Sequence, residues 1–436
     1  MRTKFKLLWF ICICAFTASL VISKVEISSY SFLGSSIEIA KSQLWTVAHQ
    51  RQISLSLLES KLSDSDRDRT IADRVTTAKA QPERLGSRLA FGSKPIPYGF
   101  PLGWYDSVDY PNTPAKIANE GINMVIPYTG DRNIQKVKTY LDRAAAANIK
   151  VLVEIPRNVV RSQRTEQIIQ FVRELKSHPA TFGWYLYDEP NSSRIAPTAL
   201  KQIYRAIKAE DPEHTIAIAF NRLFRMVKYF GAFDVALYDK YPAFYGSPEF
   251  TGFQNGIFKK LVDTAVSLTK GRSDFWYIVQ GYGEGLDGKP RFSRRLPTMA
   301  EERYMVYTTL LARVDGLFFW SHYLSQQQWI DSVLTPIIKE LHDYLPAITQ
   351  KALDNKLTVD NPAIQVKIYQ DPNTKDLLLI AINHSDRTLK TAIAIEDIEV
   401  ESVKVMGKNR LVDFSQGRLT DTFEAYAVHI YQLKSS

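Results

Sequence analysis

A chain of 436 residues, of which 45% are hydrophobic, is long enough for one large domain and a smaller one, each with its own core. The formal net charge of +9 is unevenly distributed, because residues 1–95 contain 14 Lys and Arg against 8 Asp and Glu. The rest of the chain is close to neutral and contains no zinc-finger, helix-turn-helix or RNA-recognition pattern, which argues against a nucleic-acid partner.

Residues 1–23 begin with three basic residues and continue through an apolar run. This run is longer than the core of most signal peptides and slightly short for a membrane-spanning helix. Cleavage near residues 21–23 would release a secreted protein, whereas an uncleaved segment would anchor it at the membrane. Both alternatives predict export to a secreted, periplasmic or cell-envelope location. Cys12 and Cys14 lie inside this run, so we expect no disulfide in the exported body.

Residues 24–94 are polar and include the charge-dense stretch SDSDRDRT. Apolar residues recur at roughly helical spacing over 38–62, which indicates one amphipathic helix, with simple disorder as the alternative. We interpret residues 24–94 as a spacer, and any contact with a membrane is expected only through the N-terminal segment.

Residues 95–351 alternate short runs of apolar, β-branched and aromatic residues with segments of helical period. The predicted strands span 98–104, 122–128, 149–155, 182–189, 215–221, 233–239, 274–280 and 314–321. The predicted helices span 132–147, 163–177, 197–210, 256–269, 299–312 and 330–345. Eight such units in about 250 residues predict an α/β fold, a (β/α)8 TIM barrel. An open doubly wound sheet is less favoured because no glycine-rich phosphate turn follows the first strand.

Residues 352–436 change to a period of two, in the segments AIQVKIYQ, DLLLIAIN, TAIAIEDI, VESVKVM and YAVHIYQL. Polar turns such as DPNTKD and NHSD separate these segments. The pattern predicts a small antiparallel β-sandwich after the barrel.

The segment WYLYDEPN, residues 184–191, runs from buried aromatic residues directly into two carboxylates. In a parallel barrel the carboxyl ends of the strands open onto one face, so Asp188 and Glu189 are predicted to emerge there, and Pro190 ends the strand. Polar and aromatic residues also end the other predicted strands. They are Trp104, Tyr128, Glu154, Asn221, Asp239, Tyr241, Gln280, Tyr282, Glu284, Trp320 and His322.

Five segments taken together resemble the catalytic barrel of glycoside hydrolases of the clan-A and β-galactosidase-like kind, with an appended β-sandwich. They are GWYLYDEPN, DVALYDKYP, WYIVQGYG, PTMAEERYMVYTTLL and GLFFWS, and the resemblance spans residues 97–350. It implies a carbohydrate substrate and an acid/base glutamate at the end of strand four, which matches Glu189. It also implies a nucleophilic glutamate at the end of strand seven, where this chain has Gln280.

Cleavage of an acetal needs a protonated carboxyl at the leaving oxygen and a second carboxylate near the anomeric carbon. The alternatives for the second carboxylate are Asp239, on strand six, and Glu284, four residues beyond Gln280. Asp188 stands where many clan-A enzymes have asparagine, and an Asp-Glu pair resembles that of substrate-assisted hexosaminidases, in which the aspartate orients the acetamido group of the substrate. Loss of catalysis is a further alternative, which would leave a carbohydrate-binding barrel of the cell envelope.

The mouth residues other than the carboxylates are predicted to bind substrate, and Trp320 and Tyr282 are predicted to stack on sugar rings. This binding set comprises Trp104, Tyr128, Asn221, Tyr241, Gln280, Tyr282, Trp320 and His322. A structural alternative for Glu189 is an ion pair with Arg157 or Arg222. The chain has 7 His, none in an HExxH or HxH arrangement, so neither a metal nor another cofactor is predicted.

Overall fold

The structure is a computed structural model that describes residues 99–130, 133–284, 289, 292–396, 400–407, 410 and 412–435. The predicted signal peptide or anchor, residues 1–23, and the predicted spacer, residues 24–94, lie outside the described residues. Within the described part, no helix is both long enough and apolar enough to cross a membrane.

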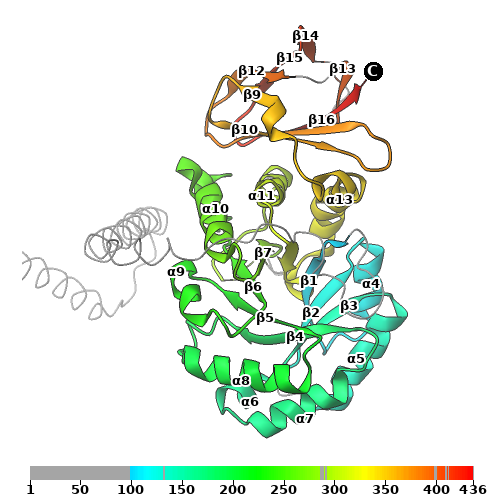
Figure 1. The fold of residues 1–436 in the computed structure, drawn as a ribbon, viewed down its shortest axis with the longest axis vertical. Helices are drawn as coiled ribbons and strands as arrows, with labels where there is room; N and C mark the ends of the chain where they lie inside the picture. Colours follow the sequence, from blue (N-terminus) through cyan, green and yellow to red (C-terminus); the bar gives the residue numbers. More distant parts are fainter. Residues whose placement is uncertain are drawn as a thin grey trace, which may run out of the picture. The chain divides into compact units, whose positions relative to one another are not determined.

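Eight parallel strands, β1 to β8, close into a barrel in sequence order, and helices surround them (Figure 1). This confirms the predicted TIM barrel. The strands are β1 Leu102–Ser107, β2 Met124–Tyr128, β3 Lys150–Glu154, β4 Thr181–Asp188, β5 Thr215–Phe220, β6 Val235–Asp239, β7 Asp274–Gln280 and β8 Gly316–Trp320. The first strand begins and ends later than the predicted 98–104, because β1 starts after Pro101, which has no N–H to donate to a ladder.

Each of the longer helices comes after a strand of the barrel. They are α5 Ile134–Ala146, α7 Thr165–Leu175, α8 Pro197–Glu210, α10 Ile257–Thr269, α11 Met299–Leu311 and α13 Thr335–Ile348. Helix α13 begins later than predicted because a π-helical turn occupies Ile330–Leu334. Four short α-helices were not predicted: α4 Thr113–Asn119, α6 Arg157–Arg161, α9 Leu223–Met226 and α12 Gln327–Trp329. Each is too short to show a helical period in the sequence.

Large rings fill the barrel interior because glycines leave room for them. Phe318 and Trp276 stack with their centroids 5.3 Å apart and their planes at 7°. A Cβ on Gly103 would lie 2.1 Å from the Phe318 ring, and one on Gly316 would lie 2.8 Å from Trp276. The interior is therefore a packed core, and only its carboxyl end is free to form a site.

The C-terminal domain consists of two four-stranded antiparallel sheets, which confirms the predicted β-sandwich. The sheets have the orders β10-β11-β16-β13 and β14-β15-β12-β9. The strands are β9 Leu357–Val359, β10 Ile364–Gln370, β11 Leu377–Asn383, β12 Leu389–Ile395, β13 Val400–Val405, β14 Asp413–Ser415, β15 Arg418–Phe423 and β16 Val428–Ser435. Strands β9, β14 and β15 were not predicted, because they are short or mostly polar.

The sandwich packs on helix α11 and on the loop that follows β6. Arg303 of α11 donates from Nη1 to the Val428 carbonyl oxygen at 2.5 Å. Phe250, in the loop between β6 and α10, stacks on Tyr426 of the sandwich with ring centroids 4.6 Å apart. The C-terminal domain therefore supports a loop at the carboxyl end of the barrel strands.

Candidate active site

A β-bulge in β4 directs Asp188 into the mouth of the barrel. The register with β5 shifts between Tyr185 and Tyr187, so Leu186 and Tyr187 both pack in the outer layer while Tyr185 packs inside. Without this extra residue, strict alternation would turn Asp188 outward. Glu189 follows with a left-handed φ of 49°, a strained conformation for a residue with a side chain.

Asp188 is held by three donors. It accepts hydrogen bonds from the Tyr185 hydroxyl at 2.9 Å and the Tyr128 hydroxyl at 3.2 Å, and it forms an ion pair with Arg157 at 2.9 Å. Arg157 also pairs with the buried Glu154 at 2.7 Å. Burial alone would lower the pKa of Arg157, but the two carboxylates outweigh burial and raise it. Asp188 is thus a positioned, ion-paired carboxylate.

Asp239, at the end of β6, lies within hydrogen-bond reach of the Glu189 carboxyl. Its side chain is only 9% exposed, and its Oδ1 has no hydrogen-bond partner among the described residues. Burial, followed by the nearby carboxylates of Glu189 and Asp188, raises the pKa of Asp239 well above its ordinary value of 3.8. Asp239 therefore retains its proton at a pH at which an exposed aspartate has lost it.

A wall of aromatic rings stands beside this carboxyl trio of Asp188, Glu189 and Asp239. Trp320 stacks on Tyr241 at 5.9 Å and contacts Tyr282 edge-on at 4.5 Å. Phe292, 68% exposed, lies 5.6 Å from Trp320, whereas Tyr282 is buried behind these rings. The Trp320 Nε1 donates to the Tyr128 hydroxyl at 2.8 Å, which links the wall to the residues that hold Asp188. This arrangement provides a flat apolar surface next to acidic groups.

Two of the predicted binding residues lie behind the strands. Trp104 is fully buried in the outer layer, where its ring centroid lies 5.4 Å from that of Phe319 and 5.4 Å from that of His322. His322 is also buried, and its Nε2 lies 3.1 Å from a carboxylate oxygen of Glu120. Because β1 extends beyond Trp104, this ring does not mark the strand end and faces the surrounding helices.

Gln280, where a nucleophile was expected from the resemblance, joins two loops. Its Oε1 accepts from the Ala243 N–H at 2.9 Å, and its Nε2 donates to the carbonyl oxygens of Ala243 at 3.1 Å and Arg295 at 2.8 Å. The side chain is fully buried. These contacts connect the loop after β6 to the loop after β7, so the amide holds the two loops together at the mouth.

Glu284 and Asn221 also contact loop residues. The Oε2 of Glu284 accepts from the Leu296 N–H at 2.9 Å, and the Gln326 amide donates to the Glu284 carbonyl oxygen at 2.9 Å. Asn221 accepts from the Asn191 amide at 2.8 Å and donates to the Ser192 hydroxyl at 3.1 Å. The structure thus brings Asp188, Glu189 and Asp239 together and leaves Glu284 with the loop after β7.

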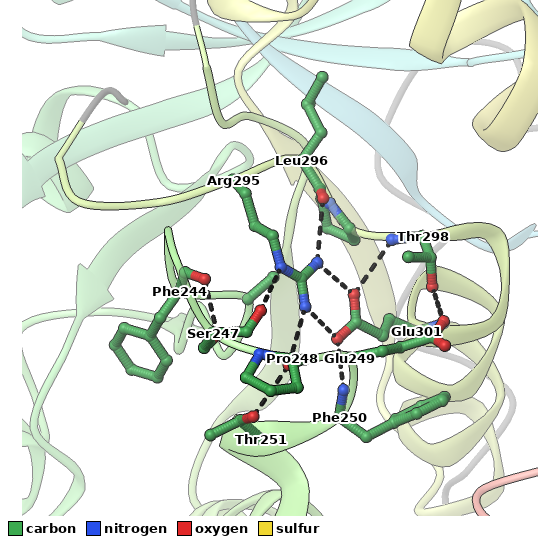
Figure 2. Close-up of polar contacts among 12 residues, drawn as sticks. Phe244, Ser247, Pro248, Glu249, Phe250, Thr251, Arg295, Leu296, Thr298 and Glu301 are labelled. Atoms are coloured by element: carbon green, nitrogen blue, oxygen red, sulfur yellow. Dashed lines mark hydrogen bonds and ion pairs between the residues drawn. The ribbon is translucent and has the colours of Figure 1, made fainter. Parts of the chain in front are cut away.

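A buried ion pair fixes the same two loops (Figure 2). Arg295 binds both carboxylate oxygens of Glu301, at 2.6 and 2.7 Å, and also donates to the carbonyl oxygens of Ser247 and Pro248. Glu301, fully buried at the start of α11, accepts in addition from the Phe250 N–H at 2.7 Å. A bidentate ion pair of this kind fixes the relative orientation of the two side chains and also stabilises the fold. It gives the loops around the aromatic wall a defined position.

Sequence reasoning missed several residues of the site. Tyr185 and Tyr105, whose hydroxyl oxygens lie 3.2 Å apart, come from strand interiors and face the trio only because of the strand register. Arg157 was considered as a partner of Glu189, yet it pairs with Asp188 and Glu154. The sequence carries one signal for the ion pair with Glu154: Arg157 lies three residues after this glutamate, which ends a strand. In the described ranges, no three His, Cys, Asp or Glu side chains are arranged as metal ligands.

Comparison with known proteins relates the fold to glycoside hydrolases. No protein-family model and no curated protein matches the sequence. A family 27 β-L-arabinopyranosidase from Geobacillus stearothermophilus matches 77% of this chain and 97% of its own, with 12% identity and a TM-score of 0.53. A bifunctional glucanase-xylanase from a metagenome library matches 80% of this chain and 98% of its own, with 10% identity and a TM-score of 0.51. An Anoxybacillus α-amylase matches 76% and 90%, with 9% identity and a TM-score of 0.50. At these identities the likeness confirms the resemblance at the level of the fold.

Proposed function

We propose that this protein is a glycoside hydrolase in which the Asp239–Glu189 pair supplies the proton and Asp188 is the second carboxylate. The observation that carries the proposal is the presence, at the mouth of the barrel, of a buried carboxyl with a raised pKa at the end of β6 and an ion-paired carboxylate at the end of β4, beside an aromatic wall. These are the groups that acetal cleavage requires. The substrate is accordingly a carbohydrate, and export through residues 1–23 belongs to the same proposal.

The interaction between Asp239 and Glu189 supports this division of roles. Opposed catalytic carboxyls lie about 5 to 5.5 Å apart in retaining enzymes and about 6.5 to 9.5 Å apart in inverting ones. Glu189 raises the pKa of Asp239 both by its charge and by hydrogen bonding, so these two carboxyls are direct neighbours and not an opposed pair. They therefore act as one unit, in which burial raises the pKa of Asp239 and favours its protonated form. Asp188 remains as the separate carboxylate.

In the proposed reaction the proton of Asp239 moves to the glycosidic oxygen as the bond from that oxygen to the anomeric carbon breaks. The carboxylate of Asp188 stabilises the positive charge that develops on the sugar, either directly or by forming a bond to the anomeric carbon. Water then adds its hydroxyl to that carbon, which breaks the bond to Asp188 where one has formed, and the remaining proton of the water passes to the Asp239–Glu189 pair. Tyr185, Tyr128 and Arg157 keep Asp188 in place.

The aromatic wall supports sugar binding. The C–H face of a pyranose packs well on an aromatic ring, and Trp320 and Phe292 present rings that solvent reaches. Trp320 is hydrogen-bonded to Tyr128, so its ring has a fixed position next to the trio.

The test is turnover of a panel of aryl glycosides and cell-wall glycans by the full-length protein. We expect at least one substrate to be hydrolysed, and we expect Asp239→Asn and Asp188→Asn to abolish its turnover. Asp263→Asn, which removes an exposed carboxylate of α10, is the matched control and retains turnover. Binding of glycans without any turnover would overturn the proposal in favour of a carbohydrate-binding barrel. Unsaturated products would indicate a lyase.

A further inference from the structure

In the described part of the chain, most large hydrophobic side chains that remain exposed gather at one end of the barrel. The exposed ones are Tyr110, Phe224, Tyr245, Ile257 and Phe292. The four aromatic ones lie in the segments that follow the carboxyl ends of β1, β5, β6 and β7. Single hydrophobic side chains scattered over a surface are normal, whereas a group on one face indicates a binding surface. The mouth therefore presents rings beyond those of the aromatic wall.

Tyr110 stacks on Tyr323, with ring centroids 5.8 Å apart and ring planes at 21°. Tyr110 lies in the turn after β1, and Tyr323 lies in the short 3-10 helix η4, His322–Leu324, after β8. Strands β1 and β8 pair with each other, so these two segments leave the barrel side by side. Tyr110 stays 51% exposed although Tyr323 lies against it. The two residues, called here the tyrosine pair, thus present an open aromatic surface.

The backbone on both sides of the tyrosine pair is held by local contacts. The Tyr110 N–H donates to the Ser107 carbonyl oxygen, and the Tyr110 carbonyl oxygen accepts from the Thr113 N–H, both at 3.0 Å. Tyr323 directly follows His322, which is buried and paired with a carboxylate at 3.1 Å. Because these segments are ordered without a ligand, little conformational entropy is lost when a ligand packs on the rings.

The tyrosine pair lies close to the aromatic wall. Tyr323 is three residues beyond Trp320, so their Cα atoms are at most about 11 Å apart. Trp320 donates to the hydroxyl of Tyr128, and that hydroxyl donates to Asp188 of the carboxyl trio. Rings therefore extend from the trio, past Trp320, to the segments after β8 and β1.

The position of the tyrosine pair favours an extended ligand over a small one. Strand β8 is opposite β4 in the ring of eight strands, so the tyrosine pair lies across the mouth from the end of β4, where Asp188 is placed. A single sugar at the trio would contact the aromatic wall and leave the tyrosine pair in water. A stack that served only to join two loops would gain most from full burial, yet half of Tyr110 is open to solvent.

We propose that the tyrosine pair is a second sugar-binding surface and that the substrate is a glycan chain long enough to contact this pair and the aromatic wall at once. This inference rests on the proposed function, because it names the substrate class of the same site. The C–H faces of separate sugar residues pack on Trp320 and on Tyr110. Each contact is weak alone, but residues of one chain bind the second surface with a high effective concentration.

The experiment measures binding of matched disaccharides and hexasaccharides from cellulose, xylan, galactan and chitin by calorimetry. The protein is the full chain with Asp239→Asn, so that the ligands stay intact. Tyr110→Ala and Tyr323→Ala are added to this background, and Tyr110→Phe keeps the ring. Phe224→Ala is the matched control, because Phe224 is 72% exposed and follows β5, which is opposite β1 in the ring of strands. Circular dichroism of each variant checks folding.

We expect the hexasaccharide of at least one glycan to bind at least about tenfold more tightly than its disaccharide. Tyr110→Ala and Tyr323→Ala should each weaken hexasaccharide binding by about five- to tenfold and leave disaccharide binding unchanged. Tyr110→Phe and Phe224→Ala should keep the preference for the longer chain.

Equal binding of long and short oligosaccharides would overturn the inference, and so would a preference that survives both alanine substitutions. An equal loss in Phe224→Ala would also overturn it, since the effect would then follow from the removal of any exposed ring. Failure of every oligosaccharide to bind would do the same, and a dimer lost in Tyr110→Ala, measured by light scattering, would assign the rings to a protein contact.

These outcomes are separate from the test of catalysis. A protein that prefers long chains through Tyr110 but hydrolyses none would contradict the proposed function and leave the second binding surface standing. A protein that hydrolyses aryl glycosides but binds long and short chains equally would do the reverse.

Discussion

Two buried aspartates, one in each domain, have opposite surroundings. Asp421 of the β-sandwich is 7% exposed and accepts hydrogen bonds from Arg410 at 2.8 and 2.5 Å and from the Tyr431 hydroxyl at 2.5 Å. Asp239 of the barrel mouth is 9% exposed and faces two other carboxylates. Similar burial thus accompanies a satisfied group in one domain and an unsatisfied one in the other.

The pKa values follow from these surroundings. Burial alone would raise the pKa of Asp421, but the hydrogen bonds of His429, Arg410 and Tyr431 outweigh burial and lower it below 3.8. For Asp239, burial and the neighbouring carboxylates act in the same direction and raise the pKa. The sandwich uses its aspartate for stability, whereas the barrel mouth holds one at a cost in stability that a catalytic proton donor would explain.

The largest expected effect is the loss of activity in Asp239→Asn. Removal of a general acid lowers kcat by about 10² to 10⁴-fold. The same substitution should leave the free energy of unfolding at neutral pH unchanged or higher, because the amide needs no proton to avoid a buried negative charge. Steady-state kinetics and denaturant unfolding measure the two quantities. A variant that is less stable and fully active would contradict the contrast between the two aspartates.

The next effect is on folding, in Asp421→Asn. The change leaves Arg410 and His429 without their carboxylate, so we expect the free energy of unfolding to fall by about 2 to 4 kcal/mol. Because Asp421 lies in the sandwich, kcat of the folded protein should stay within about twofold of wild type. Urea titration and initial rates test both points. Loss of kcat at full stability would show that the sandwich takes part in the reaction.

The pH dependence of stability should differ in sign between the two variants. The stabilising contribution of Asp421 is present above its ordinary pKa of 3.8 and is lost as the pH falls, because its folded pKa is lowered. For Asp239 the folded pKa is raised, so its contribution is present below 3.8 and is lost as the pH rises through the folded pKa.

Relative to wild type, Asp239→Asn should therefore gain stability from pH 4 to pH 7, by at most about 1.4 kcal/mol per pH unit. Asp421→Asn should be less stable than wild type by a nearly constant amount over that interval, and the difference should shrink as the pH falls below 3.8. Unfolding curves recorded at each pH provide the measurement. Parallel curves for the two variants would mean that the aspartates have similar pKa values.

The smallest effect concerns the aromatic wall. Trp320→Ala should weaken glycan binding by about five- to tenfold through loss of ring stacking, with little change in stability. Trp320→Phe keeps a ring but loses the Nε1 donor to Tyr128. It should bind nearly as well as wild type, with a lower kcat if Tyr128 positions Asp188. Equal loss of binding in both variants would favour the hydrogen bond over stacking.

Much of the site could be predicted from the residues at the ends of the predicted strands, whereas the rest depended on the register between neighbouring strands. WYLYDEPN and DVALYD show that carboxylates end strands four and six, and parallel strands of a barrel open on one face. The bulge that turns Asp188 inward has no signal in the sequence, because Leu186 and Tyr187 suit either face. For the same reason the sequence did not show that Trp104 faces the helices.

By itself, the sequence determined the barrel, the sandwich and the identity of the acidic residues at the mouth. The spacing of hydrophobic residues and the residue types at strand ends are local properties, so they can be read directly from the sequence. Tertiary structure decided which carboxylate is paired and which retains its proton, since Arg157 reaches Asp188, and Asp239 reaches Glu189, only when β3, β4 and β6 close into one ring. Burial and charge at a point depend on every neighbour in space, and those neighbours come from distant parts of the chain.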